Sequence, residues 1–456
     1  MGQVVEEHDG GLRYARRETQ AAMDEHGMRR CIERKRDGAN LTAQEWEGII
    51  GAFMRGEIDE AQMAALCMAC VWRGMSFDEA HALTSAMVAS GETIAFDASA
   101  GIVVDKHSSG GVSDIVSLVA VPLAAACGAR VAKLSGRALG HTGGTIDKLE
   151  TIPGFDVALP ISTFVEQVQR IGCAIAAQTQ ALVPADKRIY RLRDRTATVP
   201  AMGLIAASIV SKKIAGGAHA FVFDVKTGPA AFMQDPQDAS ELARWLVEIA
   251  ARFDRRATAF VTDMSQPLGR CIGTGIEVIE AREFLRGHAD PRAKELVVAI
   301  AGALLGESGL DEPETLVERA LASGRAYEKF CEMIAAQNGD VAAFEAMELG
   351  EALEIPAASS GYVAAIDVVR LGNAGRALSA NDPLGGLQVA ARIGDRIEAG
   401  QPLARAYGRD REDAIALAEA FTLSKSAAQA PPLLYDAICN AVMSVRYPRS
   451  GTVGVL

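Results

Sequence analysis

Short apolar segments, each followed by a glycine- or serine-rich loop and then a helical segment, recur through the middle of the chain. Four of these segments have the length and composition of strands, and they cover residues 101–105, 129–134, 220–225 and 257–261. Strands that alternate with helices typically form a parallel sheet with helices on its faces. The sequence therefore predicts a larger α/β domain built on a parallel or mixed sheet.

A small all-helical domain is predicted before the first strand. One helix ends at Gly38, a second begins with the capping-box pair Thr42 and Glu45, and a third ends at Gly74. Another helical stretch, 193–216, returns between the second and third strands. We therefore expect a discontinuous helical domain (28–95 and 181–216), an α/β domain (96–180 and 217–345) and an N-terminal extension (1–27).

The last part of the chain, residues 346–456, is predicted to form a third, α+β barrel-like domain. Residues 361–369 alternate like a strand, and residues 387–403 have a strand, turn and strand pattern. This pattern resembles the hairpin of biotinyl- and lipoyl-carrier domains, which carry a modifiable lysine at the hairpin tip. No lysine occurs between residues 361 and 422, so we interpret this domain as structural.

Composition excludes several classes of function. Lys+Arg 46 against Asp+Glu 58 gives a net charge of −12, which disfavours binding to nucleic acid or to an anionic membrane. The first residues have no apolar core and no apolar run is long enough to span a membrane, so we expect neither a secretory signal nor a membrane protein. The eight cysteines are scattered, as in a cytoplasmic protein with reduced thiols. Cys67 and Cys70 form one C-x-x-C inside an apolar helix, where core packing is the simpler interpretation.

The loop at 105–114 (DKHSSGGVSD) follows the first predicted strand and precedes an apolar helix. Backbone N–H groups and a helix N-terminus in such a turn attract an anion such as phosphate. Lys106 adds a positive charge, and Ser108, Ser109 and Ser117 add hydroxyl donors. His107 lies in the same loop and is the better histidine candidate for proton transfer, either in its protonated form or as a hydrogen-bond donor.

A second glycine-rich loop, 133–145 (KLSGRALGHTGGT), follows the next strand. It offers the polar groups Lys133, Ser135, Arg137, His141, Thr142 and Thr145. Neither loop matches a Walker A motif or G-x-G-x-x-G, and the sequence has no H-E-x-x-H or G-x-S-x-G motif. Because neighbouring parallel strands end at the same edge of a sheet, both loops are expected to bind one anion.

A third polar segment, 193–199, leads into a predicted helix at 202–214. Ser208 and Lys212 are four residues apart and so share one helix face, which Ile205 and Ile209 flank. A cation, a hydroxyl and branched apolar side chains suit a flat polar heterocycle. The alternative interpretation is a solvated helix end at Lys212 and Lys213.

Five segments of the chain together resemble the thymidine and pyrimidine-nucleoside phosphorylase family, most closely its broad-specificity members. These segments read DKHSSGGVSD, KLSGRALGHTGGTIDKLETIPGF, LVPADKRIYRLRDRTATVP with IAASIVSKKIAGGA, FDVKTGPAAFM and TDMSQPLG. The resemblance implies a homodimer whose subunits each bind phosphate on the α/β domain and a pyrimidine on the helical domain. It implies no organic cofactor, because phosphate is the co-substrate.

The resemblance also implies a role for individual residues. The implied phosphate ligands are Lys106, Ser108, Ser117, Lys133, Ser135 and Thr145. The groups implied to hold the pyrimidine are His107, Tyr190, Arg193, Ser208 and Lys212, of which His107, Arg193 and Lys212 are the catalytic residues because they stabilise charge on the leaving base. The residues implied to line the pocket near the base are Leu139, Val199, Ile205, Ile209 and Phe232.

Broad-specificity members of this family also hold a structural potassium ion. The matching positions are Ser113, Ile115, Leu268, Cys271 and Glu280. This chain departs from the family pattern there, because Ser113 replaces a glycine and Ile115 stands where a threonine hydroxyl is usual. Whether the ion is retained is left open by the sequence. Family members restricted to deoxynucleosides carry methionine at the position of Lys133, and members that accept both sugars carry lysine.

The expected reaction is reversible phosphorolysis of uridine, deoxyuridine and thymidine to the free base and an α-pentose 1-phosphate. Three alternatives remain open. One is a thymidine-restricted phosphorylase, and another is a phosphoribosyltransferase on the same fold, which would need Mg²⁺ and an acidic pair beside the glycine loops. The third is a sensor without catalytic activity that uses the same pocket. The sequence shows no obvious acidic pair at these loops.

Overall fold

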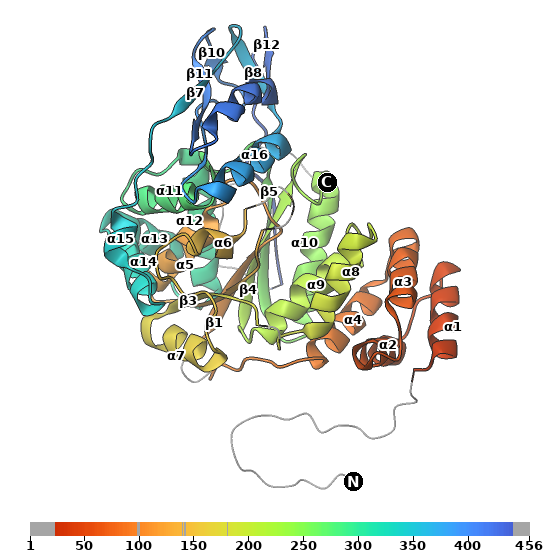
Figure 1. Ribbon diagram of the computed structural model, residues 1–456. Helices are drawn as coiled ribbons and strands as arrows, with labels where there is room; N and C mark the ends of the chain where they lie inside the picture. Colours follow the sequence, from red (N-terminus) through yellow and green to blue (C-terminus); the bar gives the residue numbers. More distant parts are fainter. Residues whose placement is uncertain (1–22, 98–100, 139, 141–142, 180, 441–456) are drawn as a thin grey trace, which may run out of the picture.

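The computed structural model describes residues 23–97, 101–138, 140, 143–179 and 181–440. It begins with four helices packed on one another, as Figure 1 shows: α1 (Glu25–Arg36), α2 (Ala43–Arg55), α3 (Glu60–Arg73) and α4 (Phe77–Ala89). The capping box of Thr42 and Glu45 is present at α2, and Gly74 ends α3 with a φ of 69°. The sequence did not predict α4 as a separate helix.

A six-stranded sheet forms the centre of the α/β region. Its strands are β1 (Val103–Ser108), β2 (Arg130–Ser135), β3 (Cys173–Ala177), β4 (Ala220–Thr227), β5 (Arg256–Asp263) and β13 (Leu434–Cys439). The order is β13-β5-β4-β1-β2-β3, and only β13 runs antiparallel to its neighbour. The four predicted strands are all present, and the mixed sheet confirms the predicted fold class.

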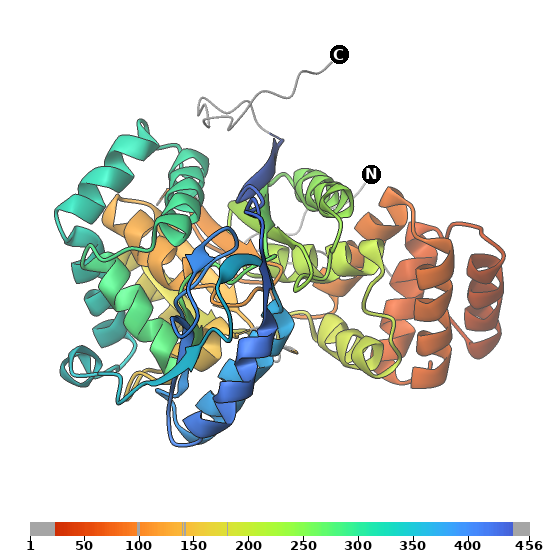
Figure 2. The same ribbon diagram turned by 90° about the horizontal axis from the view of Figure 1, so that it is seen from above.

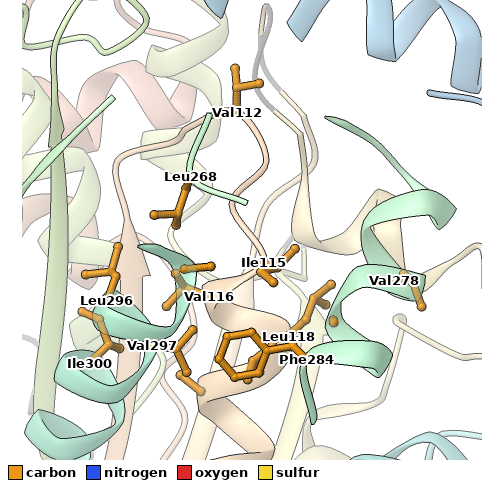
Figure 3. Packing of buried hydrophobic residues seen from close by; sticks show 14 of the residues in the cluster. Val112, Ile115, Val116, Leu118, Leu268, Val278, Phe284, Leu296, Val297 and Ile300 are labelled. Atoms are coloured by element: carbon orange, nitrogen blue, oxygen red, sulfur yellow. The ribbon is translucent and has the colours of Figure 1, made fainter. Parts of the chain in front are cut away.

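Two hydrophobic cores lie on opposite faces of this sheet. One contains Val104 and Val222 with the helices α5 (Val116–Ala126), α11 (Gly275–Leu285), α12 (Pro291–Glu307), α13 (Pro313–Ala322) and α14 (Arg325–Ala336). Figure 3 shows side chains from α5, α11 and α12 meeting there. Every residue of α5 is buried, which explains why this segment is apolar on all sides. Shorter helices on this side of the molecule are α6 (Thr145–Leu149) and α15 (Val341–Glu345).

The opposite core joins the sheet to the first four helices. Phe221 and Phe223 of β4 point into it, together with residues of α8 (Pro184–Arg195), α9 (Met202–Ala215), α10 (Pro236–Ala251) and α7 (Ile161–Ile171). Helix α9 packs against α4 and α10, and α8 packs against α2, α3, α4 and α9. Figure 2 shows the first four helices, in red and orange, at one end of the molecule. Helices α8 and α9 therefore stand between these helices and the sheet.

The C-terminal region adds two small sheets. One has the order β10-β8-β12 and the other β6-β9-β11-β7. Their strands are β6 (Cys271–Gly273), β7 (Leu353–Pro356), β8 (Gly361–Ile366), β9 (Gly386–Val389), β10 (Arg396–Ile397), β11 (Pro402–Tyr407) and β12 (Phe421–Ser424). The unpredicted helix α16 (Val368–Asn381) and a short 3-10 segment, Arg411–Ala420, pack beside them. This arrangement agrees with the predicted α+β character of the C-terminal region.

Two strands cross the predicted limits of the C-terminal domain. β6 belongs to the segment predicted as α/β but pairs with β9, and β13 belongs to the predicted C-terminal domain but pairs with β5. The domain limits remain predictions, and these pairings tie the C-terminal region to the α/β region. Within the described residues, no helix is both long and apolar enough to cross a membrane.

Candidate active site

Strand β1 delivers the first predicted anion loop. Lys106 is fully buried, and its ammonium group has no hydrogen-bond partner among the described residues. Ser108 Oγ accepts a hydrogen bond from the Gly110 N–H at 3.3 Å and donates to Asp114 Oδ2 at 2.8 Å. Ser117 follows in the first turn of α5 and is 4% exposed. The N–H groups of Lys106, which make no hydrogen bond among the described residues, are therefore available to an anion.

Strand β2 delivers the second loop beside the first, because β1 and β2 are parallel neighbours. Lys133 and Ser135 are buried, and Lys133 Nζ lies 3.2 Å from the Leu134 carbonyl and 3.4 Å from Ser135 Oγ. Thr145 is the first residue of α6, whose N-cap, Gly144, makes no side-chain capping bond. Burial and the charge of Lys213 hold the pKa of Lys133 well below its usual range.

Other polar groups of the second loop are used differently. Arg137 pairs with Asp147 at 3.0 Å and with Glu150 at 2.5 Å, so it stabilises the loop instead of facing the anion. Leu139, His141 and Thr142 lie outside the described residues. The two loops are tied together by Lys148 Nζ, which donates to the Asp114 carbonyl at 2.9 Å.

An acidic pair lies beside the first glycine loop, contrary to the expectation from the sequence. Lys226 Nζ lies 2.8 Å from Asp224 Oδ2 and 4.0 Å from Asp114 Oδ2. Lys106 Nζ lies 3.3 Å from the same Asp224 oxygen. The sequence did not reveal this pair, because 110 positions separate its members along the chain and only the pairing of β1 with β4 brings them together.

These carboxylates are neutralised by lysines. Burial acts to raise the pKa of Asp114, but Lys106, Lys226 and Lys148 outweigh it and the net pKa is lowered, so Asp114 stays ionised. Two buried lysines, Lys106 and Lys226, already supply positive charge at Asp224. Lys226 was not among the predicted site residues.

Helix α9 presents the predicted base-binding face. Lys212 Nζ donates to Ser208 Oγ at 2.7 Å, which confirms that the two side chains share one face. The same ammonium donates to Asp186 Oδ2 of α8 at 2.5 Å and lies 5.9 Å from the centre of the Tyr190 ring. Lys212 is about one-fifth exposed, at 20% of its side chain, and is thus not the solvated helix end of the alternative interpretation.

Arg193 is almost completely buried, and its guanidinium group forms hydrogen bonds with backbone carbonyls. Its guanidinium group donates to the carbonyls of Thr198 at 3.2 Å, Val199 at 2.5 Å and Leu204 at 3.0 Å. These bonds fix the loop between α8 and α9. The structure thus gives Arg193 a bracing role in addition to the catalytic role that was predicted.

The apolar residues predicted to line the pocket come from α9, from the segment before it and from the segment after β4. Ile205 is half-buried and Ile209 is buried on α9, one turn apart, and Val199 precedes this helix. Phe232 follows β4 and is 43% exposed. Within α9, the helical spacing of three and four residues places Ile205 and Ile209 on the face that carries Ser208 and Lys212.

His107 lies between the anion loops and the base-binding face. Burial and the positive charges of Lys213, Lys133, Lys212 and Lys106 lower its pKa well below the usual value. The imidazole is consequently neutral at pH 7, so it can donate a hydrogen bond but does not carry the positive charge that the sequence analysis also allowed. Lys213 Nζ pairs with Asp105 at 2.6 Å and joins α9 to β1.

The residues implied to bind potassium form an incomplete ligand set. A Cβ atom placed on Gly269 would lie 2.7 Å from both carboxylate oxygens of Glu280 and from Ser113 Oγ, so these oxygens converge. The Leu268 carbonyl, however, accepts a hydrogen bond from Arg392 Nη2 at 3.0 Å. Ile115 is buried in the core and its carbonyl caps the first turn of α5, while Cys271 donates its N–H to Glu280. The Leu268 carbonyl is thus shared with a cationic side chain, whereas Ser113 Oγ is buried without a hydrogen-bond partner among the described residues. No step of the reaction depends on this ion.

Exchanging potassium for sodium at equal ionic strength is expected to leave the melting temperature unchanged. An ion that binds the native state stabilises it by RT ln(1 + [L]/Kd), and the cation Arg392 already occupies the Leu268 carbonyl. Thermal melts in both salts measure the effect, with tetramethylammonium as the control cation. A higher melting temperature in potassium alone would contradict this expectation.

Comparison with known proteins agrees with this geometry. Residues 29–91 match the family model described as the helical bundle domain of a glycosyl transferase family, and residues 100–327 match the model of its a/b domain. The chain is 43% identical to the pyrimidine-nucleoside phosphorylase of Geobacillus stearothermophilus over 431 residues, which are 89% of this chain and 98% of that protein. It is 48% identical to the thymidine phosphorylase of Agrobacterium fabrum over 313 residues, which are 68% and 72% of the two chains.

One solved structure shares the fold at lower identity. The anthranilate phosphoribosyltransferase of Thermus thermophilus aligns with a TM-score of 0.54 at 21% identity, over 67% of this chain and 99% of that one. This likeness concerns the fold alone. The matches to both domains and the identity to relatives over most of the chain establish that the chain belongs to the thymidine and pyrimidine-nucleoside phosphorylase family of glycosyl transferases.

Proposed function

We propose that this chain catalyses the reversible phosphorolysis of pyrimidine nucleosides, with uridine, deoxyuridine and thymidine as substrates. The observation that carries the proposal is that β1 joins the two sides of the site. Its loop lies beside the loop of β2 on the anion side, and its Asp105 pairs at 2.6 Å with Lys213, the neighbour of Lys212 on the base-binding helix α9. A ligand that spans the two sides carries an anion at one end and a polar ring at the other. A nucleoside with inorganic phosphate beside it has this shape and charge.

The reaction follows from what these side chains can do. A phosphate oxygen attacks C1′ while the bond from C1′ to the base nitrogen breaks, and the electron pair of that bond remains on the base. Lys212 stabilises this negative charge with a charge-assisted hydrogen bond, and neutral His107 donates another. Lys106 and the loop N–H groups orient the phosphate, so much of the rate enhancement is positional. The released base anion then takes up a proton, which balances the proton that the attacking hydrogen phosphate loses when it becomes the sugar phosphate dianion.

The acidic pair argues against the phosphoribosyltransferase alternative. That reaction needs Mg²⁺ at a diphosphate, but here Lys106 and Lys226 lie against Asp224, and Lys226 also approaches Asp114. Lysine ammonium groups thus supply the positive charge at this position. The sensor alternative is disfavoured because polar groups that can orient phosphate and stabilise charge on a leaving base are all present. These groups are Lys106, Ser208 and Lys212.

Two further parts of the proposal concern the oligomeric state and the location in the cell. We propose a homodimer, which the exposure of Trp72 (80%) and Met68 (38%) on one face of α3 supports. We also propose a cytoplasmic enzyme that uses no organic cofactor, consistent with eight cysteines that form no disulfide among the described residues.

The decisive test is a substrate panel of uridine, deoxyuridine, thymidine and cytidine, with and without phosphate. Release of free base from the first three, with formation of the pentose 1-phosphate, is expected only when phosphate is present. Base release that is unchanged without phosphate would identify a hydrolase. Activity confined to thymidine would support the thymidine-restricted alternative.

Sugar choice is expected to depend on Lys133. Its Nζ lies beside Ser135 at the end of β2 and offers a polar partner for a 2′-hydroxyl, whereas methionine would leave that hydroxyl unpaired at a cost of ~1–3 kcal/mol. We expect Lys133→Met to lower kcat/KM for uridine roughly 5- to 150-fold more than for thymidine, at ~1.4 kcal/mol per decade. Steady-state kinetics on both substrates measure this ratio. Equal losses on both, or a wild-type enzyme inert to uridine, would remove the argument.

A further inference from the structure

Asp186 holds the ammonium group of Lys212 but was not among the predicted site residues. It lies in the first turn of α8, is 3% exposed, and accepts a hydrogen bond from Lys212 Nζ through Oδ2 at 2.5 Å. Its other oxygen, Oδ1, is buried and has no hydrogen-bond partner among the described residues. A buried carboxylate with one free acceptor is costly unless it serves a partner.

The charged and titratable groups around Lys212 come from α8 and β1, and the carboxylate of Asp186 differs from the others in its charge. Helix α8 contributes Asp186, Tyr190 and Arg193, and strand β1 contributes His107. Arg193 is a cation, Tyr190 is neutral with a pKa raised by burial, and His107 is neutral. Among these groups, Asp186 alone supplies a negative charge to Lys212.

Lys133 is a lysine of this site that has no carboxylate among its hydrogen-bond partners. Its Nζ contacts only a carbonyl and a hydroxyl. Lys212, in contrast, donates directly to the Asp186 carboxylate at 2.5 Å. A preorganised ammonium group stabilises a developing negative charge best when its direction is fixed in this way.

We propose that Asp186 is a positioning residue that holds the ammonium of Lys212 in the direction of the base, and that it acts only through Lys212 without touching the nucleoside. This inference rests on the proposed function. Two of the three N–H groups of Lys212 are used by Asp186 and Ser208, which leaves the third for the base. The free Oδ1 is a second acceptor on the same carboxylate.

A double-mutant cycle tests whether Asp186 acts through Lys212. Asp186→Asn, which keeps the shape of the side chain, is expected to lower kcat roughly 10- to 100-fold, as for loss of a hydrogen bond to a charged group. In the Lys212→Ala background the same change is expected to have no further effect. Asp186→Glu, which keeps the charge, is expected to recover part of the activity. Additive losses in the double variant would overturn the proposal.

The kinetic constants and the melting temperature separate positioning from simple stability. Because the negative charge on the base develops only in the transition state, Asp186→Asn is expected to lower kcat while KM for uridine and the melting temperature stay close to those of the wild type. A purely structural role would instead lower the melting temperature together with kcat. The matched control is Asp194→Asn, which removes an exposed carboxylate from the same helix. It is expected to behave as the wild type.

Binding of a free base keeps the inference distinguishable from the proposed function. The probe is 5-nitrouracil, whose ring N–H is acidic enough to be ionised near neutral pH, measured by calorimetry. Asp186→Asn is expected to bind it about 10-fold more weakly, with no difference in the Lys212→Ala background. If the wild type binds the probe but does not cleave nucleosides, the proposed function is wrong. The binding measurements on the single and double variants would still show whether Asp186 acts through Lys212. A wild type that does not bind the probe would overturn the inference.

Discussion

Replacing Lys212 with alanine is expected to lower the kcat of nucleoside phosphorolysis by roughly 10²–10³-fold while the chain remains folded. Removing one preorganised donor from a developing negative charge has effects of this size. The ammonium of Lys212 is held by Ser208 and Asp186 and is 20% exposed, so it faces the site and not the core. Steady-state kinetics with uridine and a thermal melt of the same preparation measure the two effects.

Two lysines near Lys212 provide the controls. Lys187 is exposed on α8, so Lys187→Ala should change neither activity nor stability. Lys213, the next residue in the chain, is 1% exposed and pairs with Asp105, so Lys213→Ala should lower the melting temperature strongly. A folded Lys212→Ala variant with near-normal kcat/KM would show that Lys212 has no catalytic role.

Local patterns in the sequence predicted local structure well. The capping box at Thr42 and Glu45 depends on residues three positions apart, and the shared face of Ser208 and Lys212 on residues four apart. Both were confirmed because helix geometry alone brings these side chains together. The same is true of the apolar helix α5, whose composition matches its complete burial.

Features that depend on distant segments were missed. Strand β13 completes the sheet by pairing with β5, and nothing within its own six residues specifies that partner. The acidic pair of Asp114 and Asp224 arises only when β1 and β4 pair. Asp186 precedes Lys212 by 26 positions and meets it because α8 and α9 pack together. The available signal for Asp186 was an acidic residue in the first turn of a helix, which is common at helix N-termini and so did not stand out.

Burial also changed the chemistry assigned to one predicted residue. The sequence placed His107 in the anion loop and allowed it a positive charge. In the folded chain the charges of Lys213, Lys133, Lys212 and Lys106 add to the effect of burial, and the imidazole is neutral. Its protonation state depends on the charges of lysines on β1, β2 and α9. No local sequence motif contains all of these residues.

Replacing Asp224 with asparagine is expected to reduce the free energy of unfolding by about 3–5 kcal/mol, the usual effect of removing one partner from a buried ion pair. Asp224 is fully buried, with Oδ2 lying 2.8 Å from Lys226 Nζ and 3.3 Å from Lys106 Nζ, while Oδ1 accepts a hydrogen bond from Thr262. Asparagine keeps the shape but leaves two ammonium groups without their shared negative charge. Urea unfolding, with Asp37→Asn at an exposed ion pair as the control, measures the loss.

Inorganic phosphate should reverse part of this loss. If Lys106 binds phosphate, the anion returns negative charge to the cluster, so the Asp224→Asn variant should gain more stability from phosphate than the wild type does. Sulfate, which has the same shape and charge, should act similarly, whereas chloride at equal ionic strength should not. Equal stabilisation of variant and wild type by phosphate would show that the anion binds away from Lys106. The buried lysines Lys106 and Lys226 would then have no part in the reaction. The size of this difference therefore measures how directly Lys106, Lys226 and Asp224 supply the charge that the transferred phosphate needs.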